Sequence, residues 1–382
     1  MARLTSRLGF VYAPDDRHYT RSDFEAWLPV LRSLGARWLT LRASWSRAIP
    51  EAFIQGLLDA DIQPIIHIPT RMGTANLPEA ASLFDCYRRW GVRHVVVFDR
   101  PNQRSAWPAQ EWGKTGLVER FLDRSLPMLR AQQAAGLVPV LPPLEPGGDY
   151  WDTAFLSGVL SSLMRRGQQS LLRDLHLAAY AWAGGHGPEW GAGGPAAWPN
   201  ARPYASGEND QDQRGVRVFE WYAAIAQDAL GAPLPTLVLA GGEVPADAGD
   251  EALAVHARQN AEIAQAMADE VTASLVAFCF HLLMAPADSP EAYAAWFISP
   301  DRPLPVVDAF RRMGAAHAAG PGAGPRPLHK YFLLPPLSDE AADRILALAG
   351  KLARLDRATL GYSIDDACLA SDVPLIGDAL AH

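Results

Sequence analysis

Short apolar runs rich in β-branched and aromatic residues recur along the chain, and segments with helical periodicity separate them. Eight runs have strand character: Leu8–Ala13, Trp38–Ala43, Gln63–Ile68, His94–Phe98, Leu137–Leu141, Leu175–Ala181, Thr236–Ala240 and Leu275–His281. The amphipathic helical segments are Arg21–Leu34, Glu51–Ala60, Glu79–Trp90, Leu117–Ala135, Thr153–Leu172, Gly215–Leu230, Asp250–Val271 and Pro305–Ala319. This alternation predicts an α/β fold, a (β/α)8 TIM barrel.

An open, doubly wound sheet is the alternative fold for such a pattern. That fold usually has a glycine-rich phosphate-binding turn after its first strand. Here the corresponding turn reads APDDRHY and contains no glycine. The barrel is therefore favoured over the open sheet.

The C-terminal part of the chain differs from the rest. Residues 1–317 form the expected barrel, and the Gly/Pro-rich stretch 318–327 (AAGPGAGPRP) predicts a linker. Residues 328–382 predict a small α/β appendage, which packs on the barrel or is a fragment of a larger domain. Its expected elements are a strand at Lys330–Leu334, a helix at Asp339–Leu355 and strands at Thr359–Tyr362 and Pro374–Ile376.

Composition excludes several classes of function. The net charge of −8 argues against nucleic acid or an anionic membrane as a partner. The three cysteines form no C-x-x-C pair, and the histidines are scattered, so we expect no metal site and no cofactor. There is no apolar run of about eighteen residues and no signal-peptide pattern, which makes a cytoplasmic location the default expectation. The sequence does not indicate an oligomeric state.

The candidate chemistry lies where the predicted strands end, because the strand ends of a barrel converge on one mouth. Aromatic rings stand there beside carboxylates and amides, as a sugar-binding cleft requires. The expected ligand-binding residues are Arg42, Trp45, His67, Arg100, Asn102, Trp107, Trp151, Tyr180, Trp182 and His281. Tryptophan and tyrosine at such positions also plug the top layer of barrels, so each ring has this second interpretation.

The order of elements, Arg42 after the second strand, the turn after strand four and the closing segment AAWFISPDRPLPVVDAFRRM resemble the clan A glycoside hydrolases. The resemblance covers roughly residues 8–316. It implies a barrel in which strand four ends Asn-Glu-Pro-Asn, with the Glu as general acid/base. It also implies a nucleophilic Glu at the end of strand seven, often within Thr-Glu-Gly-Gly. Retaining hydrolysis needs both carboxyl groups.

The sequence departs from this pattern at both catalytic positions. Asp99-Arg100-Pro101-Asn102 stands in place of Asn-Glu-Pro-Asn, so Arg100 occupies the acid/base position. Leu239-Ala240-Gly241-Gly242 aligns with Thr-Glu-Gly-Gly, which puts Ala240 at the nucleophile. The His-x-Tyr pattern of strand six keeps only Tyr180. A guanidinium stays protonated and is no useful proton donor to a glycosidic oxygen.

Three functions fit these residues. The first is a glycoside hydrolase-like barrel that binds carbohydrate or a related polar ligand at its mouth without the family's hydrolysis. The second is an active glycosidase with displaced carboxylates, in which Glu243 acts with Asp99, Glu145 or Asp149. Glu243 also has the simpler interpretation of a solvated loop residue. The third is a non-catalytic scaffold or interaction protein.

Overall fold

The computed structural model describes residues 7–201, 215–268, 273–318, 331–333 and 359–361. The chain divides into two compact units, Met1–Ala316 and His317–His382.

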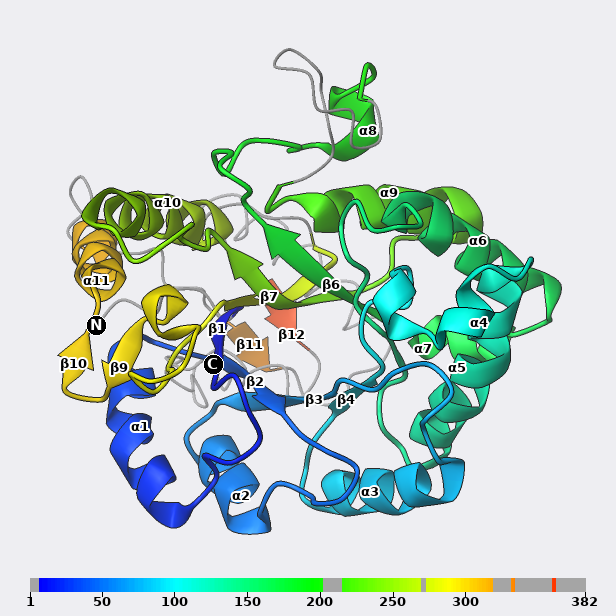
Figure 1. Cartoon of the computed structure of the whole chain (residues 1–382), viewed down its shortest axis with the longest axis horizontal. Helices are drawn as coiled ribbons and strands as arrows, with labels where there is room; N and C mark the ends of the chain where they lie inside the picture. The colour runs from blue at the N-terminus through cyan, green and yellow to red at the C-terminus, as the bar shows by residue number, and fades with distance from the viewer. Residues whose placement is uncertain (1–6, 202–214, 269–272, 319–330, 334–358, 362–382) are drawn as a thin grey trace, which may run out of the picture. The chain divides into compact units, whose positions relative to one another are not determined.

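The first unit is built on eight parallel strands (Figure 1). Their order in the sheet is β4-β3-β2-β1-β8-β7-β6-β5. A bridge between His94 and Val138 links the two ends of this sheet, so that the strands form a nearly closed barrel. The predicted (β/α)8 fold is confirmed. The strands are β1 (Leu8–Val11), β2 (Trp38–Arg42), β3 (Gln63–Ile68), β4 (His94–Val97), β5 (Val140–Leu141), β6 (His176–Trp182), β7 (Thr236–Gly242) and β8 (Leu275–Phe280).

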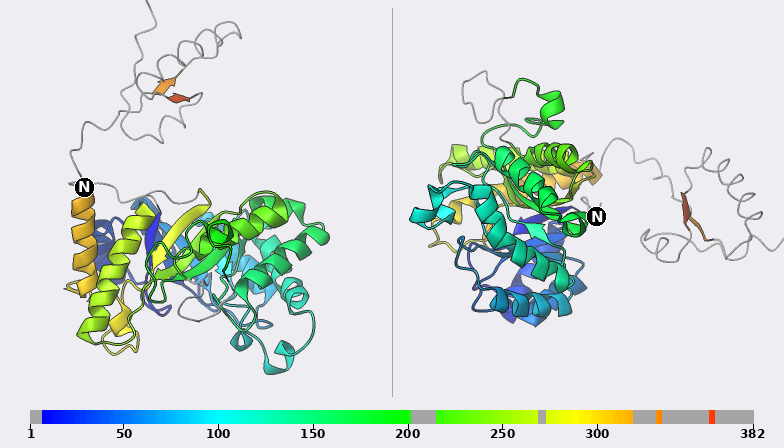
Figure 2. Two further views of the ribbon diagram at one scale, coloured as in Figure 1. Left: turned by 90° about the horizontal axis from the view of Figure 1, so that it is seen from above. Right: turned by 90° about the vertical axis from the view of Figure 1, so that its right-hand side faces the viewer.

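Helices surround the strands, as the views in Figures 1 and 2 show. The long helices are α1 (Arg21–Ser33), α2 (Glu51–Asp59), α3 (Leu77–Arg89), α5 (Leu117–Ala134), α6 (Asp152–Arg165), α9 (Val218–Leu230), α10 (Asp250–Ala268) and α11 (Pro305–Ala318). The shorter elements are η1 (Arg104–Ala106), α4 (Ala109–Trp112), α7 (Gln169–Asp174), α8 (Gly194–Ala197), η2 (Ala292–Ala294) and the hairpin of β9 (Phe297–Ser299) and β10 (Arg302–Pro303).

Local sequence signals set the helix ends. Thr20 and Asp23 form a reciprocal capping box that starts α1. The predicted helix over 153–172 is two helices, because Gly167 adopts a left-handed conformation with φ +67°. Its N–H donates to Met164 O, and the next N–H donates to Leu163 O, which is a Schellman motif. This turn ends α6 and lets α7 begin.

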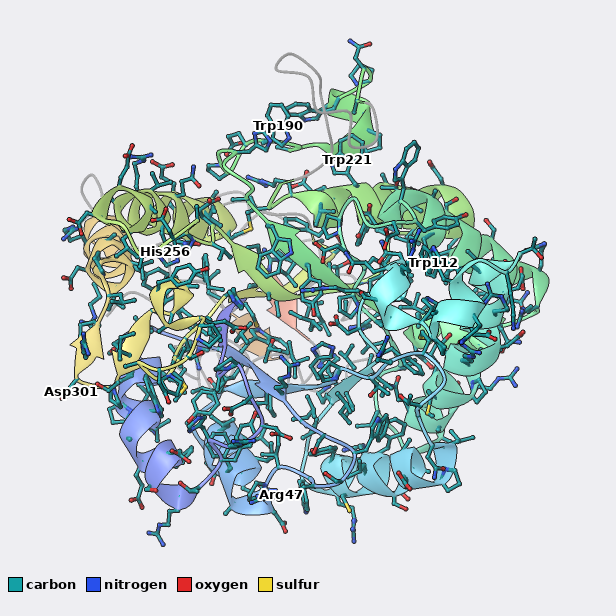
Figure 3. All side chains as sticks on the ribbon, in the orientation of Figure 1. Arg47, Trp112, Trp190, Trp221, His256 and Asp301 are labelled. Atoms are coloured by element: carbon teal, nitrogen blue, oxygen red, sulfur yellow. The ribbon has the colours of Figure 1, made fainter. Side chains whose placement is uncertain are left out.

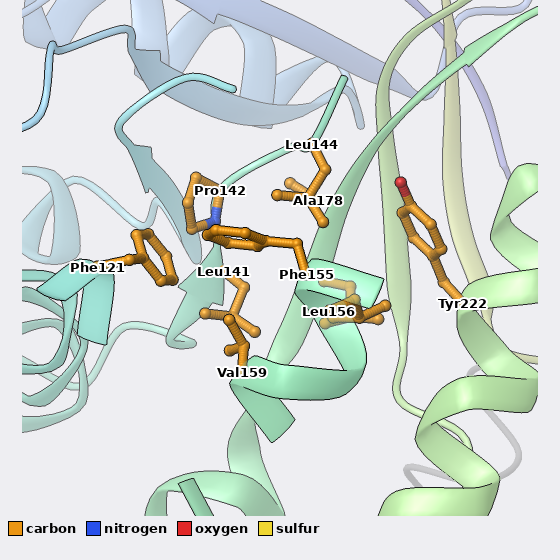
Figure 4. Close-up of a pocket in the computed structure, with 10 residues that line it drawn as sticks. Phe121, Leu141, Pro142, Leu144, Phe155, Leu156, Val159, Ala178 and Tyr222 are labelled. Atoms are coloured by element: carbon orange, nitrogen blue, oxygen red, sulfur yellow. The ribbon is translucent and has the colours of Figure 1, made fainter. Parts of the chain in front are cut away.

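Apolar residues on each strand alternate between two clusters. One packs against the helices; the other fills the barrel and includes Ile65, Val96, Leu239 and Cys279. A cavity of about 10 Å³ remains beside α6 and is lined by Phe155, Tyr222 and other apolar groups (Figure 4). It has room for about one water molecule, so it is a packing gap and not a ligand site.

In the second unit the structure describes two short strands, β11 (Tyr331–Leu333) and β12 (Thr359–Gly361). They pair in parallel, with Tyr331 opposite Thr359. Both lie where the sequence predicts strands. The predicted helix over 339–355 and the predicted strand over 374–376 lie outside the described residues. Within the described parts of the chain, none of the helices is long and apolar enough to cross a membrane.

Candidate functional site

A cavity of about 270 Å³ opens at the C-terminal ends of the barrel strands. We call it the mouth cavity. Its volume is close to the lower end of the range for small-ligand sites, about 300 Å³. The polar and aromatic side chains that line it come from β2, β3, β4, β6 and β8 or from the loops after them: Thr40, Arg42, His67, Asp99, Arg100, Tyr180, Trp182, His281 and Glu291.

Arg100 enters this cavity from a strained turn. Phe98 has φ 74° and Arg100 has φ 46°, values that non-glycine residues rarely adopt. The turn is held because Phe98 N–H donates to Ile68 O at 3.2 Å and Arg100 N–H donates to Pro143 O at 3.0 Å. Such left-handed residues cost about 1–3 kcal/mol each and cluster at functional sites.

The Arg100 side chain is fixed by three partners. Its Nε lies 2.9 Å from Glu145 Oε2 and 3.9 Å from Asp99 Oδ1. Its Cζ lies 4.6 Å from the centre of the Tyr180 ring. Burial opposes its charge, but Tyr180, Asp99 and Glu145 outweigh this effect and raise the pKa of Arg100. Arg100 is therefore a permanent cation in the mouth cavity.

An aromatic wall lies beside this guanidinium. The rings of Tyr180 and Trp182 stack with centroids 5.6 Å apart, and the Trp182 ring meets His281 edge-on at 5.6 Å. The Tyr180 hydroxyl donates to Asp99 Oδ1 at 2.7 Å. Burial, together with the nearby Asp99 charge, raises the pKa of Tyr180, which keeps the phenol protonated.

The two cavity histidines are neutral. Burial lowers the pKa of His67, and its Nε2 lies 3.1 Å from Phe98 O. Because a carbonyl oxygen only accepts, this contact assigns the proton to Nε2. Burial and then the charge of Arg100 lower the pKa of His281 to about 4. Both rings therefore offer hydrogen bonds without adding charge.

Asn102 is completely buried and joins the loops after β4 and β5. Its amide donates to Glu145 O at 2.8 Å and to Tyr150 O at 2.9 Å, and its carbonyl accepts from Glu145 N–H at 2.9 Å. It does not line the mouth cavity. It holds the Glu145 backbone in place, and through Glu145 it positions Arg100.

The displaced carboxylates of the alternative mechanism are not gathered in the mouth. Glu243 does not line the cavity; its Oε2 accepts from Gly185 N–H at 3.1 Å, and burial raises its pKa. Asp149 Oδ2 accepts from Arg104 N–H at 2.8 Å. Burial raises the pKa of Glu145, and its ion pair with Arg100 opposes that change. Of the four carboxylates that the sequence predicts for this mechanism, Asp99 lines the cavity, and Glu145, Asp149 and Glu243 do not.

Three predicted tryptophans lie outside the cavity lining. Trp107 is 1% exposed, and its Nε1 donates to Pro101 O at 2.7 Å. Trp45 is partly buried and donates to Thr70 Oγ1 at 2.7 Å. Trp151 is 50% exposed at the start of α6.

Arg42 does line the cavity, and it donates to Pro14 O at 3.2 Å.

Two further observations concern the site's chemistry. Glu291, in the loop after β8, lines the cavity, and no sequence motif marks it. Ala240, at the end of β7, also lines it. Within the described residues, no three His, Cys, Asp or Glu side chains lie close enough together to hold a metal ion.

Comparison with solved structures identifies similar folds. The chain is similar to a family 39 glycoside hydrolase from the gut symbiont Bacteroides cellulosilyticus WH2, with a TM-score of 0.55 and 12% identity. The similarity covers 81% of this chain and 63% of that enzyme, so this chain spans less than two thirds of its length. A glucosidase from Croceicoccus marinus gives a TM-score of 0.53 and 13% identity, over 81% of this chain and 68% of that chain.

No family model matches the sequence, and no curated protein matches it. The structural similarities confirm the predicted resemblance at the level of the fold: the chain shares its (β/α)8 barrel fold with a family 39 glycoside hydrolase and with a glucosidase.

Proposed function

We propose that this barrel binds a carbohydrate in the mouth cavity and does not hydrolyse it by the retaining mechanism. The observation that carries this proposal is the setting of the two residues that stand where the family resemblance predicts the catalytic carboxyl groups. Arg100 sits in the cavity with its Nε 2.9 Å from Glu145 Oε2, and Ala240 lines the same cavity. Neither residue can do the work of a carboxyl group: one cannot give up a proton, and the other cannot attack an anomeric carbon.

The rest of the cavity suits sugar recognition. Trp182 offers a ring face for the C–H groups of a pyranose. Arg42, the neutral imidazoles of His67 and His281, and the carboxylate of Glu291 supply hydrogen-bond donors and acceptors for hydroxyl groups. The site thus combines an aromatic surface with converging polar groups, as ligand sites do.

A second candidate is a hydrolase that uses other carboxylates. The observation that favours it is that Asp99 and Glu291 both line the cavity. Against it, the Asp99 carboxylate already accepts the Tyr180 hydroxyl at 2.7 Å and lies 3.9 Å from the Arg100 cation. These two contacts already engage the Asp99 carboxylate within the protein.

The experiment is a calorimetric titration of the full chain with β-linked gluco- and xylo-oligosaccharides, followed by analysis of each mixture for products. We expect binding without cleavage. Trp182→Ala should weaken binding by about tenfold or more, the effect of losing roughly 1.4 kcal/mol. The matched control is Trp151→Ala, which removes an exposed indole outside the cavity and should leave affinity unchanged.

Cleavage that is abolished by Asp99→Asn or Glu291→Gln would instead establish the displaced-carboxylate hydrolase. Equal binding by the Trp182→Ala variant and the unaltered chain would remove the mouth cavity as the site.

A further inference from the structure

A second hollow, about 520 Å³ in volume, lies at the same end of the barrel. It is lined by Arg71, Arg104, Trp107, Ala109, Trp112 and Gly113, and we call it the arginine groove. Arg71 follows β3, Arg104 begins η1 after β4, and Trp112 ends α4, where Figure 3 labels it. The arginine groove and the mouth cavity share no lining residue.

The two arginines of the groove are exposed and have no carboxylate partner in the described part of the chain. Arg71 Nη2 donates to Trp107 O at 3.5 Å, which holds this guanidinium against the groove wall. The nearby Asp149 accepts the backbone N–H of Arg104. Both guanidinium groups therefore keep donors for a ligand, in the planar arrangement that suits carboxylate and sulfate oxygens.

The surroundings of the groove strengthen its positive charge. Glu111 on α4 is shared by three cations: it lies 2.5 Å from Lys114 Nζ, 3.5 Å from Arg120 Nη1 and 3.1 Å from Arg124 Nη2. Arg120 and Arg124 also lie 5.2 and 5.0 Å from the centre of the Trp107 ring. The residues named in and beside the groove are thus five cations, Arg71, Arg104, Lys114, Arg120 and Arg124, and two carboxylates, Glu111 and Asp149, in a chain whose net charge is −8. A local excess of this kind attracts anions.

We propose that the arginine groove binds an acidic saccharide unit. Arg71 and Arg104 hold its carboxylate or sulfate, and its ring packs against the partly exposed indole of Trp112. The aromatic face beside two unpaired guanidinium groups distinguishes this groove from a simple anion site, because a free anion makes no use of an indole. The inference goes beyond the function proposed for the mouth cavity and does not depend on it.

The test is calorimetric titration of the full chain with four probes: trigalacturonate, a heparin-derived tetrasaccharide, cellotetraose and sodium sulfate. We expect one of the two acidic saccharides to bind at least about tenfold more tightly than cellotetraose, and its affinity to fall with added salt. The probe that binds identifies the acidic group as a carboxylate or a sulfate.

Three variants locate the binding. The double variant Arg71→Gln/Arg104→Gln should lose at least about tenfold in affinity for the acidic saccharide, and Trp112→Phe should retain more affinity than Trp112→Ala. The matched control is Arg21→Gln, which removes an exposed cation that pairs with Glu25 on α1 and does not line the groove. Its affinity should change by less than about threefold. Melting temperatures check that each variant is folded.

Several results would overturn the proposal. They are equal affinity for cellotetraose, an unchanged affinity in the double arginine variant, and full affinity in Trp112→Ala. If an equal concentration of sulfate displaced the saccharide, the groove would be a site for inorganic anions and would not recognise the sugar ring. Loss of acidic-saccharide binding in Trp182→Ala alone would assign that binding to the mouth cavity.

Discussion

At the scale of single residues, tryptophans that look alike in the sequence have different surroundings. Trp107 is 1% exposed and lies under two arginine side chains, whereas Trp182 lines the mouth cavity. Trp182 directly follows a predicted strand, and Trp107 lies nine residues after the end of another. Their positions in the sequence therefore do not separate a ring that packs the fold from one that faces a ligand.

We expect Trp107→Ala to lower the free energy of unfolding by about 3–5 kcal/mol, because a buried indole leaves a cavity that the core does not refill. Urea denaturation measures this change. Trp151→Ala, at an exposed indole, should change stability by less than about 0.5 kcal/mol. A Trp107→Ala variant as stable as this control would contradict the packing role.

The histidines at the start of β4 and β6 make stability depend on pH. The rings of His94 and His176 lie 5.3 Å apart, and burial lowers their pKa values to about 3 and about 4. The unfolded chain binds protons below its histidine pKa of about 6.5, and the folded chain does not. Stability should therefore be complete above about pH 6.5 and fall as the pH drops toward the folded-state values.

For His94→Leu we expect this loss to be smaller, because one titrating group is removed. The slope of unfolding free energy against pH, measured by urea denaturation between about pH 5.5 and 4.5, should decrease by about 1.4 kcal/mol per pH unit. An unchanged slope would show that His94 takes up a proton in the folded state.

At the scale of elements, the site depends on how the loops after β4 and β5 are joined. The Asn102 side chain makes three hydrogen bonds across this junction, and Glu145, which it holds, pairs with Arg100. The strained turn at Phe98 and Arg100 is stabilised by backbone bonds to the neighbouring loops. The position of the guanidinium in the mouth is thus a property of three adjacent elements.

We expect Asn102→Ala to destabilise the chain by at least about 1–3 kcal/mol, the free energy of leaving a buried polar group without a partner. It should also weaken saccharide binding in the mouth cavity, because Arg100 loses its fixed partner. Thermal unfolding and titration calorimetry measure the two effects. Asn200→Ala, an exposed amide, is the control; an Asn102→Ala variant with unaltered stability and affinity would contradict this role.

At the scale of the whole molecule, the pattern of the sequence was sufficient for the barrel but not for its mouth. Short apolar runs located every barrel strand to within a few residues, because a strand that is buried on both faces has a nearly continuous apolar sequence. The left-handed turn at Phe98 and Arg100 leaves no such signal, since neither residue type favours it. Glu291 lies in the loop after the last barrel strand, β8, and only the fold brings it to the cavity.

The central claim is that the mouth cavity binds carbohydrate without hydrolysing it. One proton NMR experiment tests it most directly: each β-linked oligosaccharide is mixed with the full chain, and saturation transfer and anomeric signals are followed in the same sample over a day. The account predicts transfer from the protein to one saccharide and anomeric signals that do not change. Growth of new reducing-end signals, or no transfer to any saccharide, would contradict it.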